Sequence, residues 1–115
     1  METKFNFKSQ ICTSKSQSET LLKLGLKKET ADMSYQYLNQ WDGWFIRPIE
    51  EDEKITHMEI PAWSLHRLMS MVYSCRAKKN GLRLAIIGYD NPFEDMIQQI
   101  EWLIEEGYFP KEYLV

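Results

Sequence analysis

The sequence predicts an α+β fold, a small and mostly antiparallel sheet with about three helices packed on it, in a single domain over residues 1–115. Apolar residues recur at helical spacing in three segments and alternate with a period of two around one Asp-Gly pair. The chain has 115 residues, the length of one domain, and 43% of them are hydrophobic. A chain of this size buries enough surface to fold without disulfides or metals.

The first helix is predicted over residues 14–24. Ser14 and Gln17 have the spacing of a capping box, in which each side chain accepts a backbone N–H at the start of a helix. Gly25 follows three leucines and can end the helix in a left-handed conformation. Residues 27–33 are predicted as one more helical turn. Before the helix, residues 4–8 alternate polar and apolar, which is typical of a short strand.

A β-hairpin is predicted around Asp42-Gly43. The pair lies between two apolar runs, and a two-residue type I′ turn needs positive φ at both central positions. Such a turn would place Trp41 opposite Trp44, and Pro48 would put the second strand at an edge or end it. The period of two then predicts one apolar face, composed of Tyr35, Tyr37, Trp41, Trp44 and Ile46.

This aromatic face has two interpretations. It packs against the core or its rim, since most aromatic surface serves packing, or it is an exposed patch that binds a partner. Trp41, Trp44 and Tyr37 are the candidate binding residues. Because no chain extends beyond a two-residue turn to cover its flanking pair, we expect Trp44 to be partly exposed and to lie beside Trp41.

The middle helix is predicted to begin near Pro61 or after Ser64. Its apolar stripe has helical spacing and comprises Leu65, Leu68, Met69 and Val72. After the helix, residues 82–89 are apolar on both faces of a predicted strand, which is typical of a central strand covered on both sides, or of one covered on one side by another chain.

A basic cluster separates these two elements. Its members are Arg76, Lys78, Lys79 and Arg83. Four cations can hold a phosphate backbone weakly, so the cluster is a weak candidate for nucleic-acid binding.

The last helix has the clearest pattern. Asn91 is a predicted N-cap, Pro92 suits the first helical position, and Gly107 ends the helix. Tyr108 or Phe109 is expected to fold back onto the last turn. The apolar stripe comprises Phe93, Met96, Ile97, Ile100, Leu103 and Ile104.

No catalytic or metal-binding group is predicted. His57-Met58-Glu59 matches half of a zinc deaminase signature, but the chain lacks the P-C-x-x-C half that supplies the other ligands. Cys12 and Cys75 fit no zinc spacing. His66 and Cys75 would lie about 13 Å apart along one helix, too far for proton transfer. We therefore expect no metal and no cofactor, and a binding protein rather than an enzyme.

Composition indicates a cytoplasmic protein with no membrane segment. The formal net charge is −3, which disfavours anionic membranes and duplex DNA as main partners. No run of 18 apolar residues occurs. The two cysteines are too few for a typical disulfide-stapled secreted domain, so reduced thiols are expected.

Three phrases carry a family resemblance: FNFKSQICTSKSQSETLLKLGLKKETADM, IPAWSLHRLM and IEWLIEEGYFPKEYLV. They resemble a family of short uncharacterised proteins of gut Bacteroides-type bacteria and their phages or mobile elements. The resemblance covers both ends of the chain and the middle helix. It implies an accessory protein of a mobile genome in the bacterial cytoplasm, and it assigns no functional residues.

The function that the sequence favours is therefore a non-catalytic protein-interaction or accessory protein of a phage or mobile element. Its partner is expected to be another protein, and self-association stays open. The alternative is a small nucleic-acid-binding accessory protein, or an enzyme whose site the sequence does not reveal.

Overall fold

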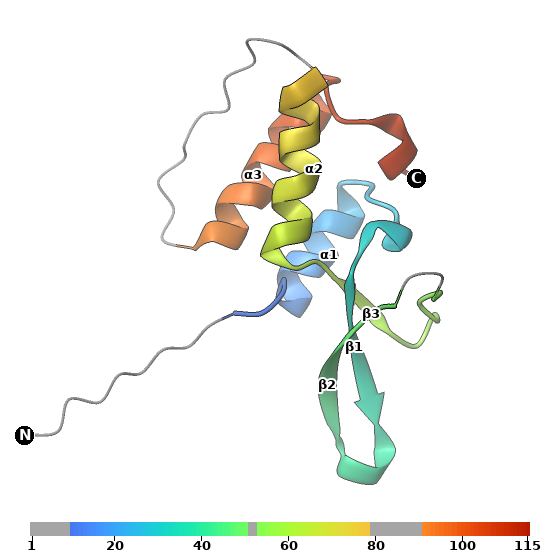
Figure 1. The fold of residues 1–115 in the computed structure, drawn as a ribbon. Coiled ribbons are helices and arrows are strands. Elements are labelled where there is room, and N and C mark those ends of the chain that lie inside the picture. The colour runs from blue at the N-terminus through green and yellow to red at the C-terminus, as the bar shows by residue number, and fades with distance from the viewer. Residues whose placement is uncertain (1–9, 51–52, 79–90) are drawn as a thin grey trace, which may run out of the picture.

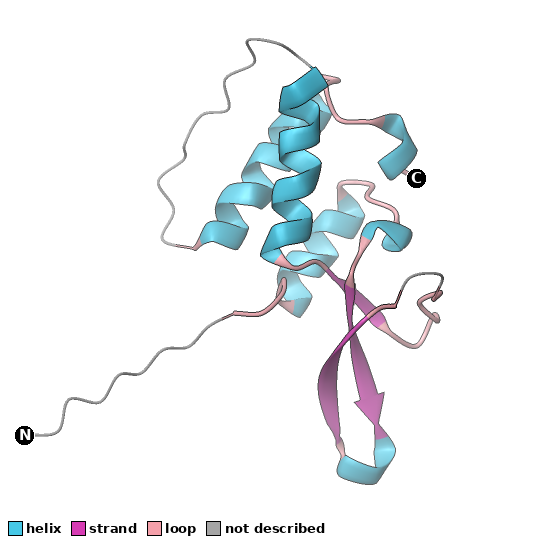
Figure 2. Ribbon diagram, in the orientation of Figure 1, coloured by secondary structure: helices cyan, strands magenta, loops and turns pink. Residues whose placement is uncertain are grey.

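The computed structural model describes residues 10–50, 53–78 and 91–115 (Figure 1). The helices are α1 (Lys15–Lys23), α2 (Leu65–Lys78) and α3 (Pro92–Glu105), and the strands are β1 (Met33–Leu38), β2 (Gly43–Pro48) and β3 (Ile60–Ala62). Figure 2 shows the helices at one end and the strands projecting from them. The predicted α+β fold is confirmed. The strands predicted at 4–8 and 82–89 lie outside the described residues.

Helix α1 begins as the sequence predicts. The Ser14 hydroxyl accepts the Gln17 N–H at 3.1 Å, and the Gln17 side-chain oxygen accepts the Ser14 N–H at 3.0 Å. Gly25 has φ 105°, a left-handed conformation that favours glycine. The predicted extra turn is a short 3-10 helix, Lys28–Thr30, which has no side-chain cap.

The sheet is antiparallel with the strand order β2-β1-β3. The short strand β3 pairs only with the first half of β1, Met33 to Tyr35, whereas β2 pairs with all of β1. Pro48 is the last residue of β2, and β2 is an edge strand, as predicted. The outer half of the β1–β2 hairpin therefore extends beyond the rest of the sheet (Figure 1).

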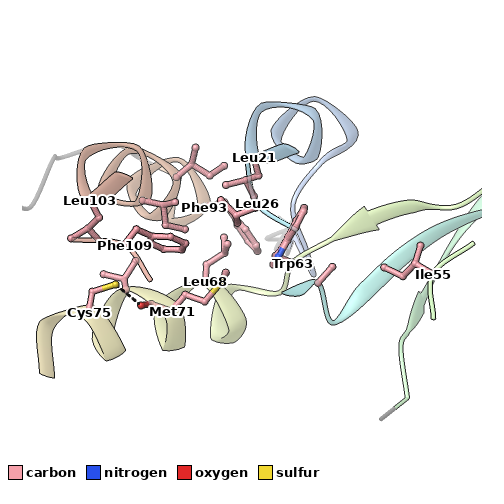
Figure 3. Packing of buried hydrophobic residues seen from close by; sticks show 14 residues of the cluster. Leu21, Leu26, Ile55, Trp63, Leu68, Met71, Cys75, Phe93, Leu103 and Phe109 are labelled. Atoms are coloured by element: carbon pink, nitrogen blue, oxygen red, sulfur yellow. Dashed lines mark hydrogen bonds between the residues drawn. The ribbon is translucent and has the colours of Figure 1, made fainter. Parts of the chain in front are cut away.

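The core lies among the helices, not on the sheet. Figure 3 shows side chains of α1, α2 and α3 converging, with Phe109 between α2 and α3. Helix α2 starts after Ser64, whose hydroxyl accepts the Arg67 N–H at 3.1 Å. Its buried stripe includes Met71 and Cys75, which the predicted stripe omitted, while Leu65 and Met69 are only half-buried.

Helix α3 and the segment after it match the prediction closely. The Asn91 side chain accepts the N–H groups of Phe93 and Glu94. The fully or nearly buried residues of the helix are Phe93, Ile97, Ile100 and Leu103. Gly107 has φ 77°, and Phe109 rather than Tyr108 packs into the core.

A buried polar network joins the sheet to the helices around Trp63. The Trp63 backbone N–H donates to the Thr13 hydroxyl at 3.1 Å, and its indole N–H donates to the Thr30 hydroxyl at 2.9 Å. The Tyr35 hydroxyl donates to the Thr13 carbonyl at 2.8 Å. Asp32 accepts both the N–H and the hydroxyl of Ser64. These bonds fix the base of the hairpin on the helical core.

Candidate functional site

The hairpin tip differs from the predicted two-residue turn. Leu38 pairs with Gly43, so a four-residue loop, 39–42, connects the strands. Asn39–Trp41 form a short 3-10 turn, and Asp42 alone is left-handed, with φ 45°. Aspartate tolerates this conformation, and its carboxylate accepts a short hydrogen bond from the Tyr37 hydroxyl. Asp42 therefore supplies the only positive φ at this turn, and Gly43 starts the strand.

The prediction that Trp41 and Trp44 are neighbours is wrong for the same reason. Tyr37, not Trp41, pairs with Trp44, and their rings meet edge to face at a centroid distance of 5.5 Å. Trp41 instead contacts Phe45, with ring centroids 5.9 Å apart. Since Trp44 and Phe45 are adjacent in the strand, they point to opposite faces. The two tryptophans thus lie on opposite faces of the hairpin.

The remaining predicted face is confirmed, but it is not a core face. Tyr35 pairs with Ile46, and Tyr37 pairs with Trp44, so these four residues share one side. The exposed fractions are 41% for Tyr37, 69% for Trp41, 44% for Trp44, 39% for Phe45 and 42% for Ile46. The expected partial exposure of Trp44 is confirmed. We call Tyr37, Trp41, Trp44, Phe45 and Ile46 the aromatic hairpin surface.

Lys15 covers part of this surface from α1. Its ammonium nitrogen lies 4.0 Å from the centre of the Trp44 ring and 5.8 Å from that of Tyr35. A cation over an indole face is attracted by the ring quadrupole, and the contact is worth about 0.5–1 kcal/mol when exposed. Lys15 therefore orients Trp44 without burying it.

Arg47 holds the base of the hairpin. Its guanidinium contacts both carboxylate oxygens of Glu59, at 2.9 and 3.0 Å, and reaches Glu53 at 2.7 Å. Glu59 also accepts the Ser34 hydroxyl at 2.8 Å. These partners raise the pKa of Arg47, chiefly through the Glu59 hydrogen bond. The clamp joins both hairpin strands to the segment before β3, so the aromatic hairpin surface stands on a fixed base.

The other candidate residues do not form a site. Arg76 and Lys78 lie in the last turn of α2, and Lys79 and Arg83 fall outside the described residues. His57 and His66 are exposed in separate places. In the described ranges, no group of three or more His, Cys, Asp or Glu side chains is arranged to hold a metal ion.

Cys12 and Cys75 are not joined in a disulfide, and both are buried. Burial raises the pKa of the Cys12 thiol, and the hydrogen bond with Tyr35 opposes that rise only in part. A raised pKa keeps the thiol protonated and hence a poor nucleophile. Cys12 therefore packs in the structure and offers no reactive thiolate.

An open groove of about 880 Å³ lies between the 3-10 turn Lys28–Thr30, helix α2 and the C-terminal residues 112–115. Leu26 and Met71 contribute apolar lining. Lys28 and Arg67 bring positive charge, and Glu29 and Glu112 bring negative charge. This mixture selects no ligand class and places no acid–base pair over a reacting position.

The sequence interpretation placed Ile46 on the apolar face but did not count Phe45 as a member of the surface or Lys15 as its support. The signal for Phe45 was present, because Trp44, Phe45 and Ile46 are consecutive. Three consecutive apolar residues in a strand must make both faces apolar, and Pro48 had already indicated an edge. Nothing local marks Lys15, whose contact with Trp44 spans 29 residues and depends on the tertiary fold.

No protein-family model, curated protein or solved structure matches this chain. Among the described residues, no helix is long and apolar enough to cross a membrane.

Proposed function

We propose that this chain is a non-catalytic interaction protein that binds another protein through its aromatic hairpin surface. The observation that carries the proposal is the exposure of five large apolar side chains within ten residues, 37–46, on both faces of a projecting hairpin. Exposed aromatic clusters of this kind mark interfaces, because aromatic anchors contribute much of the binding energy when a partner buries them.

The fixed base supports the same proposal. The clamp on Arg47 and the network around Trp63 restrain the hairpin before any partner arrives. A surface that is already ordered loses little conformational entropy on binding, which favours affinity.

The resemblance to short proteins of gut bacteria and their phages supports a finer proposal. On that basis, the chain is an accessory protein of a phage or mobile element that acts in the bacterial cytoplasm. Two buried cysteines that form no disulfide with each other are consistent with a reducing compartment.

The test is capture of partners from a lysate of a gut bacterium by the immobilised protein, followed by mass spectrometry. The test variant carries Trp41→Ser and Trp44→Ser. The matched control carries Leu22→Ser and Tyr73→Ser, which remove two exposed apolar side chains of α1 and α2. We expect the control to keep the partner and the test variant to lose it. Equal capture by the two variants would contradict the proposal.

A further inference from the structure

The outer edge of β2 offers backbone hydrogen bonds at defined positions. The Ile49 N–H donates to the Asp32 carbonyl at 2.9 Å, which continues the β1–β2 register by one residue beyond Pro48. Residues along an antiparallel strand alternate between pairs that exchange hydrogen bonds and pairs that do not. The backbones of Arg47 and Phe45 therefore face β1, and those of Trp44 and Ile46 face outward.

This edge has few of the features that protect edge strands. Charged residues, bulges and prolines normally prevent strand addition. In β2, Pro48 lies only at the end, and the single charged residue, Arg47, is engaged by Glu53 and Glu59. Within the described residues no strand pairs with this side of β2.

We propose that the occupant of this edge is a second copy of the chain, paired antiparallel β2 to β2 about a two-fold axis at Phe45. The proposal rests on the proposed function and names the partner of the aromatic hairpin surface. The two three-stranded sheets would then form one continuous sheet of six strands.

The register follows from which groups face outward. Within β2, only Trp44 and Ile46 have an N–H and a carbonyl that face outward. Pairing Trp44 of each copy with Ile46 of the other lets all of these groups form hydrogen bonds. A shift toward the tip would engage Asp42, which is left-handed and not extended. A shift toward the base would engage Pro48, which has no N–H. With the axis at Phe45, both Trp44–Ile46 pairs form, and Asp42 and Pro48 lie opposite each other beyond these central pairs.

The side chains fit this arrangement. On one face Trp44 would lie against Ile46 of the second copy, and on the other face the two Phe45 rings would meet at the closely spaced pair. Arg47 would lie opposite Gly43, so no like charges oppose each other. Antiparallel pairing also places the two helical parts at opposite ends of the sheet, where they do not compete for space.

The area indicates a weak dimer. If an aromatic side chain offers roughly 150–250 Å², the exposed fractions of Trp44 and Phe45, the aromatic residues of the paired strand, leave roughly 120–210 Å² per copy to bury. With the backbone of the two strands, the interface stays below the standard size of specific complexes and in the range of weak ones. We therefore expect dissociation at micromolar concentrations.

Sedimentation equilibrium of the full chain tests the association. We expect a monomer–dimer equilibrium for the natural chain and a dissociation constant at least tenfold higher for Ile46→Lys, since lysine on an edge opposes strand addition. The matched control is Tyr73→Lys, at an exposed apolar position of α2, and it should dimerise like the natural chain. Equal weakening by both variants, or none by Ile46→Lys, would overturn the proposal.

Single cysteine variants test the register. Phe45→Cys places two thiols at the closely spaced pair, with Cα atoms about 4.5 Å apart, within the range that a disulfide spans. Trp44→Cys places them two residues out of register, roughly 7–8 Å apart. We expect covalent dimer at least tenfold faster for Phe45→Cys under mild oxidation. Faster cross-linking of Trp44→Cys would refute the register.

One pattern would separate this inference from the proposed function. If the natural chain stays monomeric up to about 200 μM, well above a micromolar dissociation constant, the second copy is not the partner. If the Trp41→Ser, Trp44→Ser variant still loses a captured protein, the aromatic hairpin surface binds a different chain. The proposed function then stands and the dimer fails.

Discussion

Trp63, two residues before α2, is fully buried, whereas Trp41, at the hairpin tip, keeps 69% of its surface exposed. The two environments differ in how the indole is used. Trp63 donates its indole N–H to Thr30, 33 residues away, and belongs to the core cluster that the three helices share. The indole N–H of Trp41 donates to the adjacent Gln40 side chain. The buried tryptophan therefore connects distant parts of the chain, and the exposed one contacts its sequence neighbours Gln40 and Phe45.

The comparison extends to the two regions as wholes. The helical core contains Phe109 and is held by hydrogen bonds between segments that are distant in sequence, while the hairpin carries exposed apolar side chains on both faces. The stabilising core and the proposed binding surface thus lie in separate regions. A substitution in one region should leave the property of the other unchanged, and the following variants test that division.

Trp63→Ala should have the largest effect on stability. Loss of a buried tryptophan costs about 3–5 kcal/mol, and it also removes the indole N–H that donates to the Thr30 hydroxyl. Trp41→Ala should change the free energy of unfolding by no more than about 0.5 kcal/mol, as is usual for a surface position. Urea denaturation measures both. Similar losses in the two variants would remove the division between core and hairpin.

Ile100→Ala should cost about 2–5 kcal/mol as a core truncation, because Ile100 is fully buried in α3. Gln99→Ala, the neighbouring change on a less buried side of the helix, should cost almost nothing. The same denaturation experiment compares them. Equal costs would show that the apolar stripe of α3 is misassigned.

The hairpin tip should respond at Asp42 and not at Gly43. Asp42→Val should destabilise by about 1 kcal/mol or more, because a β-branched residue resists the left-handed conformation that Asp42 adopts. Gly43→Val should have a small effect, since an added Cβ meets only ordinary contacts at 3.7 and 3.9 Å. A larger loss of stability from Gly43→Val than from Asp42→Val would support the two-residue turn that the Asp-Gly pair predicts.

Alkaline pH should slightly lower the free energy of unfolding, because Tyr35 at the base of the hairpin ionises. Burial and the Cys12 contact raise the pKa of Tyr35 from 10.0 to about 12. In the unfolded chain the hydroxyl ionises near pH 10, so its stabilising contribution is complete below pH 10 and is lost as pH rises to about 12. The pKa of Cys12 is also raised, so its contribution to stability is likewise lost as pH rises.

The control for this titration is Tyr35→Phe. It removes the ionising hydroxyl, so its stability should fall less steeply than that of the natural chain between pH 10 and 12. Identical slopes in urea titrations across that window would rule out Tyr35 as the titrating group.

Local signals predicted much of the fold. The capping box at Ser14, the N-cap at Asn91 and the left-handed glycines lie where their spacing placed them, because each depends on neighbours within one or two turns. Trp63 was not singled out. Its burial depends on Thr13 and Thr30, which are distant in sequence, and no local pattern reveals such partners.

The candidate site was predicted in part. Tyr37, Trp41 and Trp44 are all exposed, as a binding surface requires. Their arrangement was wrong, because the Tyr37–Asp42 hydrogen bond accompanies a four-residue loop instead of a type I′ turn. The four-residue loop shifts the register, so Trp44 pairs with Tyr37 and the two tryptophans lie on opposite faces.

The central claim is that the aromatic hairpin surface is not core. The most direct measurement is the far-UV circular dichroism and urea unfolding of the Trp41→Ser, Trp44→Ser variant. We predict a native spectrum and a cooperative unfolding transition, because the buried network around Trp63 is untouched. An unfolded spectrum in the absence of urea would show that the two tryptophans stabilise the fold, and would contradict the account.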